Sequence, residues 1–230
     1  NLKKTIARAA DKHAQSGDRW RALEQLRDDG SPEAIGGMLR RFSFVYDKSI
    51  EDEQEKEFVY QSLVELGGKT LPELRRYMRE SETLAWPLKI LEHIVKGDTL
   101  RDTLRTLCEQ NDNSYVRDPS KKIQLVHFMG EHREPAIAEL IVQYLEDVDE
   151  GVRFKAVEAL LHQGQRDVIL EPLVKLLRLS TEESRRVKVR IVEGLAEAGF
   201  PLGELGPGVA EVLSELGIDA RLDGQRRVRM

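Results

Sequence analysis

Apolar residues recur along this chain at the three- and four-residue spacing of a helix face, in stretches that each end at a glycine. These glycines stand at intervals of 30 to 37 residues. A fixed period in this range is typical of a solenoid of stacked helices, because each repeat buries its apolar face only against its neighbours. The glycines are Gly30, Gly67, Gly97, Gly130, Gly164 and Gly199.

Two of these stretches, residues 152–164 and 187–199, agree most closely with each other. Both open with a valine and a basic residue, and both end with a leucine four residues before the glycine. Their apolar positions share one helix face, which predicts burial between neighbouring repeats. The residues predicted to be buried there are Ala156, Leu160, Val187, Ile191 and Leu195.

The same pattern predicts helices over almost the whole chain. Ser31, followed by a proline, predicts a helix start, because serine caps free N–H groups and proline fits the first turn. Thr70 with Glu73, and Ser180 with Glu183, have the spacing of a capping box and predict two further starts. The main predicted helices span residues 3–15, 18–28, 50–66, 87–95, 99–109, 119–129, 135–145, 151–163, 168–179, 185–198 and 209–216.

These elements predict an all-α fold, a right-handed α-solenoid of stacked antiparallel helix pairs that forms a single domain. The predicted parts are a lead-in helix in residues 1–17, about six repeats in 18–199 and a C-terminal cap in 200–230. In the cap, Asp223 and Gly224 stand between two short stretches with strand character, which predicts a β-hairpin with a two-residue turn.

Residues 152–164 carry the pattern V-R-x-x-A-x-x-A-L followed by a glycine. This pattern resembles the first helix of a HEAT repeat, in particular the short bacterial type also found in phycobilin lyases. The resemblance extends over residues 18–199 and implies that the second helices of the repeats line a concave surface. It also implies that Asp149 pairs with an arginine of an adjacent repeat. The matching residues are Val152, Arg153, Ala156, Ala159, Leu160 and Gly164.

Composition narrows the class of protein. Of the 230 residues, 40% are hydrophobic and only 6% aromatic, which suits helices packed through aliphatic side chains. The net charge of -5 argues against a dedicated nucleic-acid-binding domain, which is usually basic. The single cysteine, Cys108, excludes an intramolecular disulfide and favours a reducing compartment. With no membrane-spanning stretch and no visible signal peptide, we expect a cytoplasmic protein.

The sequence contains no recognisable catalytic or cofactor motif. HEAT-type hydroxylases hold iron through His-Glu dipeptides, and this chain has none. His127 and Glu131 share a helix face, but two ligands do not complete a metal site. No G-x-S-x-G turn or phosphate-binding glycine loop occurs. We therefore expect a protein that is not an enzyme and needs no metal and no cofactor.

Basic residues recur on the predicted second helices, where the resemblance to HEAT repeats places the concave surface. Carboxylates such as Glu73, Asp102 and Glu171 lie on the same helices. Mixed charge around an apolar patch favours a protein partner, whereas a continuous basic stripe would follow a phosphate backbone. The candidate partner-binding residues are Arg40, Arg41, Arg75, Arg76, Arg79, Arg101, Arg105, Lys175 and Arg178.

The sequence thus favours a scaffold that binds a protein partner through the concave helical surface. One alternative is a nucleic-acid-binding module similar to the HEAT-like alkylpurine DNA glycosylases. Another is a chaperone for a chromophore or cofactor, similar to the phycobilin lyases. The acidic run at residues 51–57 is predicted to lie in solvent at the start of a helix.

Overall fold

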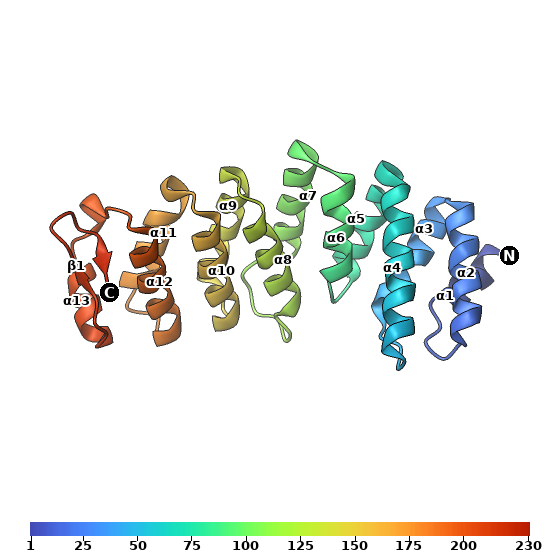
Figure 1. Ribbon diagram of the computed structural model, residues 1–230, viewed down its shortest axis with the longest axis horizontal. Coiled ribbons are helices and arrows are strands. Elements are labelled where there is room, and N and C mark those ends of the chain that lie inside the picture. Colours follow the sequence, from blue (N-terminus) through green and yellow to red (C-terminus); the bar gives the residue numbers. More distant parts are fainter. The chain divides into compact units, whose positions relative to one another are not determined.

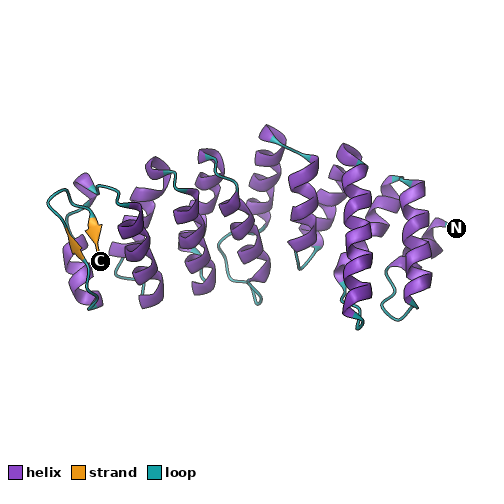
Figure 2. Ribbon diagram, viewed as in Figure 1, coloured by secondary structure: helices purple, strands orange, loops and turns teal.

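The computed structural model describes residues 1–230, which form two compact units, Asn1–Thr103 (unit 1) and Leu104–Met230 (unit 2). Each unit is built of stacked antiparallel helix pairs, as predicted, and strands occur only near the C-terminus (Figure 2). No helix has both the length and the apolar character that crossing a membrane requires. The prediction that the whole chain forms a single domain stays a prediction.

In unit 1 the first helices of the repeats form one layer and the second helices another. The helices α2, α4 and α6 lie side by side, and α3 packs against α5 (Figure 1). The elements are α1 (Leu2–Ala9), α2 (Ser16–Asp29), α3 (Pro32–Leu39), η1 (Arg40–Ser43), α4 (Ser49–Glu65), η2 (Gly67–Thr70), α5 (Leu71–Glu80), α6 (Ala85–Ile94) and the start of α7 (Gly97–Gln110).

Unit 2 has the same two layers. The first helices α8, α10 and α12 lie side by side, and α11 packs between α9 and α13 (Figure 1). The elements after α7 are α8 (Ser120–Glu131), α9 (Pro135–Val142), η3 (Gln143–Glu146), α10 (Glu150–Gln163), α11 (Arg166–Arg178), α12 (Arg185–Ala198), η4 (Gly203–Leu205), α13 (Val209–Leu216), β1 (Arg221–Leu222) and β2 (Val228–Arg229).

The residues predicted to lie between repeats of unit 2, among them Leu160 and Ile191, are all fully buried. Cys108 is buried as well, with its Sγ 3.7 Å from Met129 Sδ. Burial raises the pKa of the Cys108 thiol to about 11, so this side chain is a protonated part of the core at neutral pH.

The lead-in helix is shorter than predicted. Helix α1 ends at Ala9, and α2 begins at Ser16, which therefore starts a helix instead of breaking one. The guanidinium of Arg19, on α2, donates hydrogen bonds to the carbonyl oxygens of Asp11 and Ala14. These bonds hold the connection between α1 and α2 in a turn, so the first helix does not continue.

The repeat glycines have two different roles. Gly30, Gly164 and Gly199 end helices in the left-handed conformation, with φ of 60°, 65° and 64°, as a C-terminal glycine stop requires. Gly130 lies inside α8 instead, where an added Cβ would come within 2.9 Å of the Cβ of Ala159. Gly130 thus permits close packing of α8 on α10, and α8 continues to Glu131, beyond its predicted end at residue 129.

Only one of the predicted helix caps forms. Ser31 caps α3 by accepting a hydrogen bond from a backbone N–H of the first turn. The hydroxyl of Thr70 donates instead to a carbonyl oxygen of α4, at 2.8 Å. Helix α12 is capped by Ser184 and not by Ser180, because the chain between them turns before the helix begins.

One buried and one partly buried ion pair link successive repeats of unit 2. Lys122 Nζ, on α8, lies 2.8 Å from Asp147 Oδ2 in the loop before α10. Arg153 Nε, on α10, lies 2.7 Å from Glu182 Oε2 in the loop before α12. Asp149 does not make the predicted pair, because its carboxylate caps α10. A pair between repeats forms two residues earlier, but it joins Asp147 to a lysine, Lys122, and not Asp149 to an arginine.

The C-terminal cap has the predicted hairpin with a longer turn. Strands β1 and β2 pair antiparallel, and residues 223–227 connect them, so the predicted two-residue turn is wrong. The longer loop is held by Asp223, whose Oδ1 accepts hydrogen bonds from the backbone N–H groups of Gln225 and Arg227. Val228 is fully buried and β2 contacts α12, so the hairpin covers the last repeat.

Candidate protein-binding surfaces

Four of the basic residues predicted to bind a partner in unit 1 lie beside acidic or hydroxyl side chains. Arg40, Arg75, Arg76 and Arg79 are exposed and Arg101 is half-buried. Since carboxylates of the same helices neutralise several of them, unit 1 presents mixed charge here and not a continuous basic stripe. The neighbouring pairs are Arg75 with Thr103, Arg76 with Glu73, Arg79 with Glu80 and Arg101 with Asp98.

Arg41 cannot contact a partner in this structure. Its side chain is 0% exposed, because it points into the interior of unit 1 towards α4. The prediction grouped it with the exposed Arg40, the preceding residue, but adjacent residues on a helical turn point in different directions. Arg41 is therefore removed from the candidate binding residues.

In unit 2 the remaining basic candidates, Arg105, Lys175 and Arg178, are exposed. Arg178 packs against Gly208, the residue that precedes α13. A Cβ added to Gly208 would lie 3.1 Å from Arg178 Nε. Glu171 is exposed on the same helix as Lys175 and Arg178, so α11 also carries both signs of charge.

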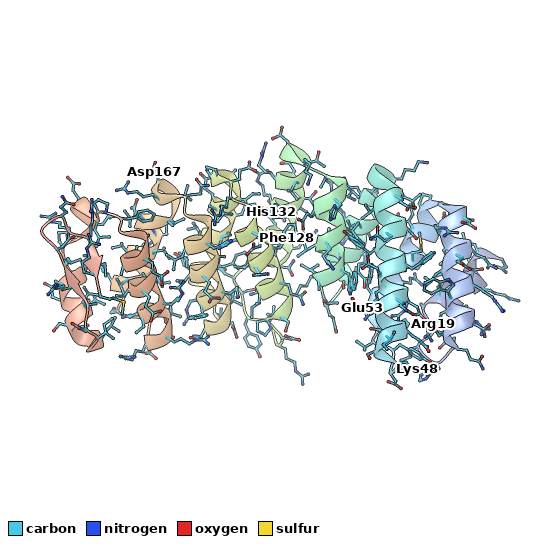
Figure 3. All side chains as sticks on the ribbon, viewed as in Figure 1. Arg19, Lys48, Glu53, Phe128, His132 and Asp167 are labelled. Carbon is cyan, nitrogen blue, oxygen red and sulfur yellow. The ribbon has the colours of Figure 1, made fainter.

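Arg41 belongs to a buried ion cluster, which consists of Arg19, Arg41, Asp52, Glu55 and Lys56. Glu55 is its centre: Arg19 Nε and Arg41 Nε donate to Glu55 Oε2 at 3.0 and 2.6 Å. Arg41 Nη2 also donates to Asp52 Oδ1 at 2.7 Å, and Lys56 Nζ lies 2.8 Å from Asp52 Oδ2. Figure 3 shows Arg19 on α2 beside α4. The expectation that the acidic run stays in solvent is thus wrong for Asp52 and Glu55.

Aromatic rings close this cluster on the side of the loop before α4. The guanidinium carbon of Arg19 lies 4.0 Å from the centre of the Tyr46 ring, and that of Arg41 lies 4.2 Å from the centre of the Phe44 ring. The backbone N–H of Tyr46 donates to Asp52 Oδ1 at 2.9 Å. The cluster therefore fixes the loop as well as the helices, and its role is structural.

We expect the buried ion cluster to make unit 1 sensitive to acid. Burial alone raises the pKa of the Glu55 carboxyl, but the hydrogen bonds from Arg19 and Arg41 outweigh it and lower the pKa below its ordinary value. The pKa of Asp52 is lowered in the same way, by Lys56 and Arg41 against burial.

Carboxyls with a lowered folded-state pKa contribute stability above their unfolded pKa and lose it as the pH falls through the folded pKa. The free energy of unfolding should therefore fall progressively below about pH 5. Urea unfolding of the wild type and of Glu55→Gln over this range separates Glu55 from other carboxyls. The difference between the two proteins should shrink with acid, and a difference independent of pH would contradict the assignment.

Large apolar side chains are exposed on the loops that lead into the first helices. In unit 2, Tyr115 is 77% exposed and Val148 61%, and Val116 lies beside Tyr115 in the same loop. The backbone N–H of Val148 donates to the carbonyl oxygen of Asn113 at 3.2 Å, so the loops before α8 and α10 are in contact. We call Tyr115, Val116 and Val148 the loop edge of unit 2.

The same position is apolar in unit 1, where Val45 and Ile50 are 75% and 74% exposed at the entry to α4. Sequence-based prediction of the binding surface did not include these residues. The available signal was the presence of large apolar residues within otherwise polar connections, at 42–53 and 110–118. Isolated exposed apolar residues are ordinary, but several on adjoining loops mark a contact surface.

A groove of about 540 Å³ runs across the first helices of unit 2. The residues that line it include the small residues Gly130, Ala159 and Gly194, together with acidic and basic side chains. His127, Glu131 and His162 all line it, and His162 Nε2 lies 3.5 Å from Glu131 Oε2. No group of three or more histidine, cysteine or acidic side chains with the arrangement of a metal site occurs in residues 1–230.

No protein-family model matches the chain, and no curated protein matches it. The chain is similar in structure to human deoxyhypusine hydroxylase in complex with glycerol, with a TM-score of 0.33 and 15% sequence identity. The match covers 95% of this chain and 90% of that one. The similarity is too distant to transfer an activity.

The comparison corrects one expectation from the sequence. The protein was expected not to be an enzyme, because the chain contains no recognisable catalytic or cofactor motif. The matched protein is a hydroxylase. The expectation is therefore contradicted, and we do not retain it.

Proposed function

We propose that this chain binds a protein partner and that the loop edge of unit 2 is a principal contact. We also infer that its repeats are of the short bacterial HEAT type. The motif at residues 152–164 supports this second inference, together with the pairs Lys122 with Asp147 and Arg153 with Glu182.

The exposure of Tyr115 is the observation that carries the proposal. Tyrosine is enriched at protein interfaces, because it offers a large rigid contact area together with a polar hydroxyl. Tyr115, Val116 and Val148 expose apolar area on two loops in contact, whereas the surrounding surface is charged. Covering this area with a partner would remove apolar surface from water, which favours association.

The exposed arginines of the second helices are a second proposed contact. The mixed charge around Arg76 in unit 1, and that around Lys175 in unit 2, is more favourable for a protein surface than for a phosphate backbone. Charges at the rim of an interface act mainly on specificity and association rate. We therefore assign the larger share of the affinity to the apolar loop edge.

The test is affinity purification from the native organism, with quantitative mass spectrometry and matched baits. Tyr115→Ser combined with Val148→Ser should lower recovery of the partner at least tenfold, as loss of an aromatic hot spot does. Met230→Ser is the control, because Met230 is a 63% exposed apolar residue outside the loop edge. Equal recovery by all baits with unchanged helicity would reject the loop edge as the contact.

A second measurement separates a protein partner from nucleic acid. We expect the wild-type protein to bind unrelated DNA duplexes no more tightly than about the micromolar range at physiological salt. Replacing Arg76 and Arg105 with glutamate should reduce partner capture and have no further effect on duplex binding. Much tighter duplex binding with a steep salt dependence, lost in that variant, would replace the proposed function with nucleic-acid binding.

A further inference from the structure

We infer that the loop edge of unit 2 recognises an apolar protein segment that carries basic residues. This inference rests on the proposed function, since it names the class of partner for the same surface. It depends on two properties of the loops: the apolar side chains already described and the charges that surround them.

Carboxylates surround the loop edge. In the two loops, at residues 111–118 and 146–149, Asp112, Asp118 and Glu146 are exposed and Asp149 is half-buried. Arg117 is the only basic residue in these two stretches. Arg153, on α10, donates to the carbonyl oxygen of Val148, but its charge is balanced by Glu182. The fifth carboxylate, Asp147, is already neutralised by the buried Lys122. A ligand on this edge therefore meets apolar side chains within a field of net negative charge, which attracts cationic groups.

Two of these carboxylates are held in position by their own loop. Asp112 Oδ1 accepts a hydrogen bond from the backbone N–H of Ser114 at 3.0 Å, and Asp118 Oδ1 accepts one from that of Ser120 at 2.9 Å. The hydroxyls of the same two serines donate to the same oxygens. Hydrogen bonds from the serines lower the pKa of both aspartates, so both are anionic at neutral pH. Fixed charges of this kind need little reordering when a cation binds.

Unit 1 has the same combination at the entry to α4. Val45 and Ile50 are flanked by Asp47, Glu51 and Glu53. The one basic residue beside them, Lys48, lies 3.4 Å from Glu51 Oε1. Apolar side chains within an acidic surround thus recur at corresponding loops of the two units, which supports a common preference for cationic apolar segments.

The negative charge around the loop edge also disfavours other classes of ligand. Nucleic acids and anionic lipid surfaces carry phosphates, which the carboxylates of these loops repel. An acidic apolar protein segment would be repelled in the same way. A segment with basic residues next to apolar ones is complementary to the edge in both respects, and we commit to it.

The experiment measures binding of labelled peptides to the full chain by fluorescence anisotropy. The three probes have equal length: a leucine–lysine peptide, its leucine–glutamate counterpart, and a serine–lysine peptide without apolar side chains. The leucine–lysine peptide should bind at least tenfold more tightly than either of the others. Tyr115→Ser with Val148→Ser should lower its affinity at least tenfold, and Met230→Ser should not change it.

A variant that removes charge tests the contribution of the carboxylates around the loop edge. Asp112→Asn with Glu146→Gln keeps the size of both side chains. It should lower the affinity for the leucine–lysine peptide about threefold to tenfold, because two surface charges are removed. The same variant should not lower the affinity for the leucine–glutamate peptide. The loss should also become smaller as salt is added, because salt screens exposed charges.

The outcomes separate the inference from the proposed function. Equal binding of both leucine peptides, lost together in Tyr115→Ser with Val148→Ser, would overturn the preference for basic segments and leave the protein-binding edge standing. If Tyr115→Ser with Val148→Ser left the affinity for the peptides unchanged, the loop edge would be rejected as the binding surface. A serine–lysine peptide that binds as tightly as leucine–lysine would also overturn the inference. Light scattering completes the test: a wild-type dimer that the apolar variant abolishes would assign the edge to a second copy of the chain.

Discussion

Replacing Glu55 with glutamine should lower the free energy of unfolding at pH 7 by about 3–5 kcal/mol, the range for removing one partner of a buried ion pair. Both Arg19 and Arg41 bind this carboxylate and both are fully buried. The amide of glutamine has the same shape but no charge, so two guanidiniums would stay buried without a full counter-charge. Urea unfolding followed by circular dichroism measures the change.

Glu53→Gln is the matched control for this experiment. Glu53 lies on the same helix, α4, with an exposed side chain, and is marked in Figure 3. A surface substitution of this kind should change stability by less than about 0.5 kcal/mol. If Glu55→Gln cost no more than Glu53→Gln, the buried ion cluster would not stabilise unit 1, whatever its geometry.

The second large effect is expected for Leu160→Ala, which should cost about 2–5 kcal/mol, as buried leucines do when truncated. Leu160 is fully buried on α10, which packs against both α8 and α12. Loss of its side chain would leave a cavity that helices held on both sides cannot easily close. Denaturant unfolding of the full chain measures the effect.

The same substitution at an exposed leucine provides the comparison. Leu179 lies just after α11 and is 41% exposed, so Leu179→Ala should cost less than about 1 kcal/mol. A cost for Leu160→Ala as small as this would mean that the helix face predicted from the repeat pattern does not form the contact between repeats.

The helices and the contacts between repeats could be predicted because their signals are local and repeated. Leu160 and Leu195 hold equivalent places in two copies of one pattern, so each supports the interpretation of the other. The residues packed between neighbouring helices are also apolar because they are buried there. Helix ends were less predictable. Ser180 and Ser184 could both cap α12, and the turn between them determines that Ser184 does so.

The buried ion cluster could not be predicted, because it depends on which distant side chains meet. Arg41 and Glu55 look like ordinary surface residues in the sequence, one beside another arginine and one in an acidic run. Only the packing of η1 against α4 brings them together and removes them from water. The loop edge was missed because the path of the loops sets the exposure of Tyr115 and Val148, and the helical pattern of the sequence does not give that path.

The ion pairs between repeats in unit 2 bear on how such a chain can lengthen or shorten during evolution. The first helices α8 and α10 each supply a cation, Lys122 or Arg153, and the loop before the following first helix supplies the carboxylate, Asp147 or Glu182. Removing the segment from Asp147 to Thr181 would therefore bring Glu182 to the place opposite Lys122. An insertion of one more repeat would likewise find a partner at both ends. The junctions are interchangeable in charge, so gain or loss of a whole repeat leaves no buried ion unpaired.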